Sequence, residues 1–141
     1  MEMNIVVDSS GVAKLVDFGM SSLNGSSPTA HIGPIRWAAP ECVVRNQTSS
    51  FHSDKYSLGM SIIEAAIGCD PWGQLSDTGI HYELGHRQFL AQPAQLNNDH
   101  WRLITSLCTF EPNQRCTIDF AIDQLEAFAL IEANVHLQTS S

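Results

Sequence analysis

The stretch from Asp54 to Ile67 constrains the fold more than any other part of this sequence. At helical spacing its apolar residues form two stripes, with only a narrow polar strip between them. The first stripe holds Tyr56, Met60, Ile63 and Ile67, the second Leu58, Ile62 and Ala65, and the polar strip Ser57, Ser61 and Glu64. A helix that is apolar around most of its circumference must be covered on most sides. We therefore predict a helix at the centre of the fold, capped by Ser53 and ended by Gly68.

Two short apolar runs near the start of the chain predict a β-hairpin. Residues 5–7 and 12–16 flank the turn sequence at residues 8–11, in which Gly11 can take a positive φ angle. The composition then changes, and residues 20–34 are polar, rich in serine and without a period. A loop of this length inside a compact domain usually has a function or is disordered.

Helices are predicted for most of the remaining chain. We expect a weak helix from Thr78 to Arg87, a second that begins at Asn97 or Asn98 and ends by residues 111–113, and a third capped by Thr117. The third has apolar residues at i, i+3, i+4 and i+7, and residues 137–141 are expected to fray after it. The predicted fold is therefore mainly α-helical, with a short N-terminal β-hairpin.

Composition restricts the partners of such a fold. The formal net charge is -8, which disfavours binding to nucleic acid, and no stretch approaches the length of a membrane span. The cysteines Cys42, Cys69, Cys108 and Cys116 are widely spaced and contain no C-x-x-C pair. We expect them to be buried free thiols in a cytoplasmic protein.

Several short motifs occur in a fixed order along the chain. Asp17-Phe18-Gly19 follows the second predicted strand and opens the polar loop, and Ala39-Pro40-Glu41 closes that loop. Asn4-Ile5-Val6-Val7 precedes them, and Ser53-Asp54-Lys55-Tyr56-Ser57-Leu58-Gly59 and then Arg115 follow. In this order the motifs resemble the C-lobe of the protein kinase family. The resemblance runs from Asn4 to about Phe128 and is strongest to the tyrosine-kinase-like Ser/Thr kinases.

The resemblance implies a nucleotide and metal site at the start of the chain. Asn4 matches the catalytic-loop asparagine that holds a second Mg²⁺ ion, and Asp17 matches the aspartate that chelates the Mg²⁺ ion bound to ATP. Amide and carboxylate oxygens are the ligands that this hard cation prefers. Phe18 matches the residue whose packing differs between active and inactive kinases, and Gly19 completes the motif.

Three further residues have structural roles by the same resemblance. Glu41 is expected to pair with Arg115, whose planar fork can satisfy a buried carboxylate at both oxygens. Asp54 matches the aspartate that holds the backbone of the catalytic loop. Residues 1–136 are thus predicted to be a partial kinase domain, with residues 17–41 as its activation segment.

Other parts of a kinase active site have no match in this sequence. We find no Gly-rich loop, no lysine at the ATP-pairing position and no catalytic aspartate, so no catalytic residue is assigned. We expect a C-lobe fragment that lacks the N-lobe, is inactive alone and binds ATP and Mg²⁺ weakly or not at all. The alternatives are a non-catalytic kinase-like binding module and an unrelated small helical interaction protein.

The resemblance implies transfer of phosphate to protein hydroxyls. Pro34-Ile35-Arg36-Trp37 resembles the substrate-facing loop of tyrosine kinases, whereas residues 53–73 resemble the tyrosine-kinase-like group, and we favour Ser/Thr specificity. Expected partners are a protein substrate and an upstream kinase acting on the loop. The candidate phosphosites are Ser21, Ser22, Ser26, Ser27 and Thr29. Arg36 or Arg45 could bind such a phosphate; the alternative is a solvated, serine-rich loop.

Overall fold

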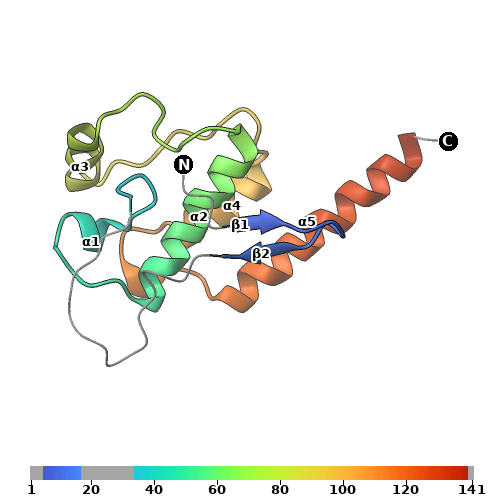
Figure 1. Cartoon of the computed structure of the whole chain (residues 1–141), viewed down its shortest axis with the longest axis horizontal. Helices are drawn as coiled ribbons and strands as arrows, with labels where there is room; N and C mark the ends of the chain where they lie inside the picture. The colour runs from blue at the N-terminus through green and yellow to red at the C-terminus, as the bar shows by residue number, and fades with distance from the viewer. Residues whose placement is uncertain (1–4, 17–33, 140–141) are drawn as a thin grey trace.

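The computed structural model of the chain describes residues 5–16 and 34–139. Its elements, in chain order, are β1 (Ile5–Val7), β2 (Ala13–Leu15), α1 (Pro40–Val43), α2 (Phe51–Ile67), α3 (Asp77–Gly85), α4 (Asn98–Leu107), the 3-10 helix η1 (Pro112–Gln114) and α5 (Ile118–Thr139) (Figure 1). The predicted fold class, mainly α-helical with a short N-terminal hairpin, is confirmed.

Strands β1 and β2 pair antiparallel around the predicted turn. Gly11 has a φ angle of 84°, which explains the glycine at this position. The Asp8 carboxylate accepts hydrogen bonds from the backbone N–H groups of Ser10 and Val12 at 2.9 and 3.0 Å, and Lys14 Nζ lies 2.7 Å from it. These contacts, with that of Lys14 the largest, hold the pKa of Asp8 well below its usual value.

The start of α2 differs from the prediction, because Ser50 and not Ser53 is its N-cap. Ser50 Oγ accepts a hydrogen bond from the Ser53 backbone N–H at 3.2 Å, and Ser53 Oγ accepts one from the Ser50 N–H at 2.7 Å. This reciprocal capping box places the helix start about one turn earlier. The predicted end is confirmed, since Gly68 is left-handed with φ of 72° and its N–H bonds to the Glu64 carbonyl at 2.8 Å.

The next two helices differ from the prediction at their ends. Helix α3 begins at Asp77 instead of Thr78 and ends at Gly85 instead of Arg87. Ser76 caps it by accepting a hydrogen bond from the Gly79 N–H at 3.1 Å. Of the two asparagines considered for the start of α4, Asn97 is the N-cap. Its side chain accepts hydrogen bonds from two backbone N–H groups of the first turn. Helix α4 ends at Leu107, before the proline of η1.

Helix α5 begins as predicted and ends later. Thr117 Oγ1 accepts a hydrogen bond from the Phe120 N–H at 3.2 Å. The helix continues through residues 137–139, which were expected to fray, and residues 140–141 lie outside the described range. Figure 1 shows its second half extending away from the other helices. The apolar residues Leu130, Ile131 and Val135 of α5 are exposed. Within the described residues, no helix combines the length and the apolar character that a membrane span requires.

Helix α2 packs against α4 to form the core, as its first apolar stripe predicts. Buried residues from these two helices are Tyr56, Met60, Ile63, Leu103, Ile104 and Leu107. The second predicted stripe is less covered, because Leu58 and Ile62 are half-buried and Ala65 is exposed. The first stripe therefore faces the core.

Helix α2 lies close to the end of α4 at Gly59. A Cβ atom added to Gly59 would lie 2.4 Å from Cys108 Sγ and 3.3 Å from Leu107 Cβ, so only glycine fits. Burial raises the pKa of the Cys108 thiol and keeps it neutral. All four cysteines are free, as expected. Cys42 and Cys108 are buried, but Cys116 is only half-buried and Cys69 is exposed, so the expected burial was wrong for these two.

We expect Gly59→Ala to lower the free energy of unfolding by about 1–3 kcal/mol, because the added methyl group overpacks the contact between α2 and α4. Urea unfolding followed by circular dichroism would measure the change. Gly85→Ala is the matched control, since no atom lies within 4 Å of the position that its added methyl group would take. A change of about 0.5 kcal/mol or less is expected there. Equal effects of the two substitutions would contradict the packing argument.

Candidate functional site

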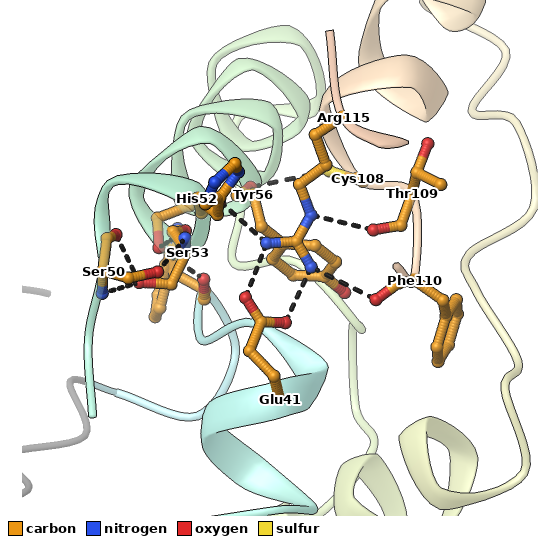
Figure 2. Close-up of polar contacts among 11 residues, drawn as sticks. Glu41, Ser50, His52, Ser53, Tyr56, Cys108, Thr109, Phe110 and Arg115 are labelled. Atoms are coloured by element: carbon orange, nitrogen blue, oxygen red, sulfur yellow. Dashed lines mark hydrogen bonds and ion pairs between the residues drawn. The ribbon is translucent and has the colours of Figure 1, made fainter. Parts of the chain in front are cut away.

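Among the described residues, the guanidinium of Arg115 donates the largest number of side-chain hydrogen bonds. Its Nη1 and Nη2 atoms donate to Oε1 and Oε2 of Glu41, both at 2.7 Å, in a bidentate ion pair (Figure 2). The two residues are 5% and 3% exposed, respectively. The structure therefore brings together the two residues that the motif order paired.

Backbone carbonyls accept the other donors of Arg115. Nε donates to the Thr109 carbonyl at 2.8 Å, Nη1 to that of His52 at 2.7 Å, and Nη2 to that of Phe110 at 3.5 Å (Figure 2). All five N–H donors of the guanidinium thus have an acceptor. The group also lies 5.2 Å from the centre of the Tyr56 ring.

This ion pair joins segments that are distant in the sequence. Glu41 is in α1, where Pro40 occupies the first turn and favours helix formation. His52 is at the start of α2, and Thr109 follows α4. The Cys42 thiol is nearby; burial, and to a smaller extent the Glu41 charge, raises its pKa. The arrangement supports the structural role expected for Glu41 and Arg115.

The segment before α1 is attached to α2. Trp37 Nε1 donates to Oε2 of Glu64 at 3.0 Å, and Ser57 Oγ donates to the Trp37 carbonyl at 2.9 Å. The polar strip predicted on α2 therefore faces this segment, not solvent. Residue spacing reveals the strip, but it does not reveal which segment the strip contacts.

Arg36 attaches the same segment to the turn after α2. Its Nη1 atom donates to the carbonyls of Pro71 and Gly73 at 2.8 and 3.0 Å, and its Nη2 atom donates to the Leu75 carbonyl at 2.7 Å. These three hydrogen bonds engage the guanidinium of Arg36 in a contact that was not predicted from the sequence. The prediction that Arg36 could bind a phosphate on the loop stays a prediction, because residues 21–29 lie outside the described residues. Nothing in the sequence indicated these carbonyl contacts, since a backbone acceptor has no residue-specific pattern.

Arg45, the other residue considered for a phosphate, lies on the surface. Arg45 Nη2 is 3.7 Å from Glu111 Oε1, and Arg87 Nη1 is closer to the same oxygen at 2.9 Å. The hydrogen bond from Arg87 is the main cause of the lowered pKa of Glu111. Ion pairs as exposed as these contribute little to stability.

The predicted nucleotide and metal ligands lie outside the described residues. These ligands are Asn4 and Asp17. The predicted structural residues Phe18 and Gly19 and the candidate phosphosites Ser21, Ser22, Ser26, Ser27 and Thr29 also lie outside the described residues. Asp54 is described, in the first turn of α2; it is exposed, yet partial desolvation raises the pKa of its carboxyl group. Across residues 5–16 and 34–139, no three His, Cys, Asp or Glu side chains are grouped in a way that could hold a metal ion.

A cavity of about 140 Å³ lies between α2, α4 and α5. Its lining residues are Ile62, Leu96, His100, Leu103, Leu125 and Phe128. His100 is the single titratable residue among them, so this cavity has no group of residues for acid–base or metal chemistry.

We expect Glu41→Gln to lower the free energy of unfolding by about 3–5 kcal/mol, because it leaves the guanidinium charge of Arg115 buried without a counter-charge. Arg115→Lys should have a smaller effect, because it keeps the charge but loses the bidentate geometry. Chemical denaturation would measure both.

Asp99→Asn is the control for these substitutions, since it removes the exposed partner of Arg102. A change of about 0.5 kcal/mol or less is expected. If Glu41→Gln were no more destabilising than this control, the buried pair would not hold the fold together.

Comparison with known proteins confirms the resemblance over most of the chain. The profile of the family described as "Protein kinase domain" matches residues 2–125. The chain is 30% identical over 121 residues to mitogen-activated protein kinase kinase kinase 1a of Physcomitrium patens, covering 84% of this chain and 16% of that protein. It is 33% identical over 126 residues to the serine/threonine-protein kinase CTR1 of Arabidopsis thaliana, covering 86% of this chain and 15% of that protein.

A growth factor receptor also matches. Fibroblast growth factor receptor 2 of Dugesia japonica is 28% identical over 126 residues, covering 86% of this chain and 14% of that protein. The chain thus spans about one sixth of the length of these relatives or less. The family match excludes the alternative of an unrelated small helical protein. The chain belongs to the protein kinase family.

Proposed function

We propose that this chain is the C-lobe part of a Ser/Thr protein kinase domain, which transfers the γ-phosphoryl group of ATP to protein hydroxyls. The observation that carries the proposal is the family match over residues 2–125, which includes Asp17-Phe18-Gly19 and Ala39-Pro40-Glu41. Phosphoryl transfer depends mainly on positioning and charge stabilisation, so it requires a rigid C-lobe.

The geometry after residue 34 supports this role. The bidentate contact with Arg115 fixes Glu41, and hydrogen bonds to α2 and to the turn after it fix the segment before α1. In the family this segment faces the protein substrate, and we propose the same here. A segment held by several hydrogen bonds presents a fixed surface, which lowers the entropy lost when a substrate binds.

Asn4 and Asp17 are proposed to hold Mg²⁺ and, through it, ATP. Their amide and carboxylate oxygens fit this metal ion. The bound ion would neutralise charge on the phosphates. The second candidate function is a non-catalytic binding module. Such a module has no need for the Mg²⁺ ligands Asn4 and Asp17, so their presence favours a catalytic domain.

Ser/Thr specificity is proposed from the relatives. Two of the three relatives described above have names that state a mitogen-activated protein kinase kinase kinase or a serine/threonine kinase, and one is a receptor of the fibroblast growth factor class. We propose a protein substrate and regulation by an upstream kinase acting on residues 21–29. A cytoplasmic location completes the proposal, supported by the four free cysteines.

We expect the 141-residue chain by itself to transfer no phosphate, because its sequence contains no catalytic aspartate, ATP-pairing lysine or Gly-rich loop. Purified chain would be incubated with labelled ATP, Mg²⁺ and a mixture of Ser-, Thr- and Tyr-containing peptides. Magnesium-dependent labelling that persists in an Asp17→Ala preparation would indicate a contaminating kinase. Labelling that disappears in this variant would overturn the expected inactivity.

We expect weak, Mg²⁺-dependent binding of ATP that Asp17→Asn abolishes, because the substitution removes the proposed carboxylate ligand of the metal ion. A titration followed by ATP phosphorus NMR would measure it, with Asp119→Asn in the first turn of α5 as control. If the wild-type chain bound no ATP at all, the non-catalytic binding module would be favoured.

A further inference from the structure

Three backbone carbonyls converge on one guanidinium at the turn that follows α2. The oxygen atoms of Pro71, Gly73 and Leu75 lie 2.8, 3.0 and 2.7 Å from the donor nitrogens of Arg36. Each carbonyl belongs to a different residue of one short turn, and the turn is closed by a hydrogen bond from the Leu75 N–H to the Trp72 carbonyl at 3.1 Å.

The backbone of this turn is held in an unfavourable conformation. Trp72 has a φ angle of 69° and Gly73 one of 55°. A left-handed conformation is costly for a residue with a large side chain, and it persists only where surrounding contacts enforce it. The bonds from Arg36 are such contacts, because they orient the carbonyls on both sides of Trp72.

The three carbonyls accept hydrogen bonds from a planar group that carries several N–H donors. A guanidinium presents its donors in a rigid fork, whereas an ammonium is a compact, strongly hydrated charge on a flexible stem. Arg36 and the Pro71 carbonyl are at least partly buried, so an unpaired acceptor there would be costly.

The next residue, Trp37, is attached to α2 itself. The Trp37 indole donates to Glu64, and the Trp37 carbonyl accepts from Ser57, both on α2. Adjacent residues thus attach one segment to two different elements, directly before α1 begins. Two local hydrogen bonds stabilise the turn within this segment. The Trp37 N–H donates to the Pro34 carbonyl and the Ala38 N–H to the Ile35 carbonyl, both at 3.1 Å.

We infer that Arg36 is a positioning residue, whose contact with the three carbonyls of residues 71–75 fixes the orientation of residues 34–38. Since the proposed function places the protein substrate against this segment, the inference rests on that function for its consequence. Arg36 therefore acts through the segment it holds, and it does not receive a phosphate from residues 21–29.

Hydrogen exchange at three amides tests the positioning role. In Arg36→Gln, exchange at the N–H groups of Trp37, Ala38 and Leu75 is expected to be about tenfold faster, because both attached segments open more often. Arg36→Lys should resemble Arg36→Gln. The matched control is Arg102→Gln, which removes an exposed arginine from α4 and should leave all three rates unchanged.

Chemical rescue distinguishes positioning from general packing. In Arg36→Ala, about 10 mM guanidinium chloride should slow exchange at the three amides again, whereas the same concentration of ammonium chloride should not. Wild-type exchange rates in Arg36→Lys, or equal effects of the two salts, would overturn the inference.

A second readout uses the wild-type chain and does not depend on whether a variant folds. The side-chain N–H resonances of Arg36, assigned by their loss in Arg36→Lys or by backbone connectivity, should be unchanged by inorganic phosphate and by phosphoserine. Movement of these resonances would show that the group binds anions, which contradicts the inference. Neither experiment measures ATP binding or phosphate transfer, so their failure is distinguishable from failure of the proposed function.

Discussion

The buried ion pair between Glu41 and Arg115 is the interaction on which the arrangement of the helices depends. A carboxylate that is 3% exposed is tolerable only beside a charge that satisfies both oxygens. The guanidinium does this and also bonds the backbone at His52, Thr109 and Phe110. One side chain therefore fixes α1, the start of α2 and the chain after α4 relative to one another.

The second constraint is the close packing of α2 and α4. Gly59 lets Cys108 and the end of α4 approach α2. The polar strip of α2 then faces outward to the segment before α1, where Glu64 and Ser57 bond Trp37. The same helix thus forms the core on one side and positions the proposed substrate-facing segment on another, which links stability to function.

Much of the fold could be predicted from the sequence, because its signals are local. The apolar stripes of α2, the turn at Gly11 and the cap at Thr117 each depend on residues a few positions apart. The predicted start of α2 was wrong because Ser50 caps the helix through reciprocal hydrogen bonds with Ser53, which the residue types alone do not reveal. The proposed Mg²⁺ ligands were identified by motif, and their geometry lies outside the described residues.

By itself, the sequence determined the helical periodicity and the ends marked by Gly68 and Thr117, because side-chain chemistry and spacing encode these features. The pairing of Glu41 with Arg115 was implied by the resemblance to the protein kinase family. Only the tertiary structure decided which groups complete the coordination of Arg115 and what Arg36 binds. In both cases the acceptors are backbone carbonyls. Every residue has such a carbonyl, so its identity as a partner arises only when folding brings a particular turn within hydrogen-bond distance.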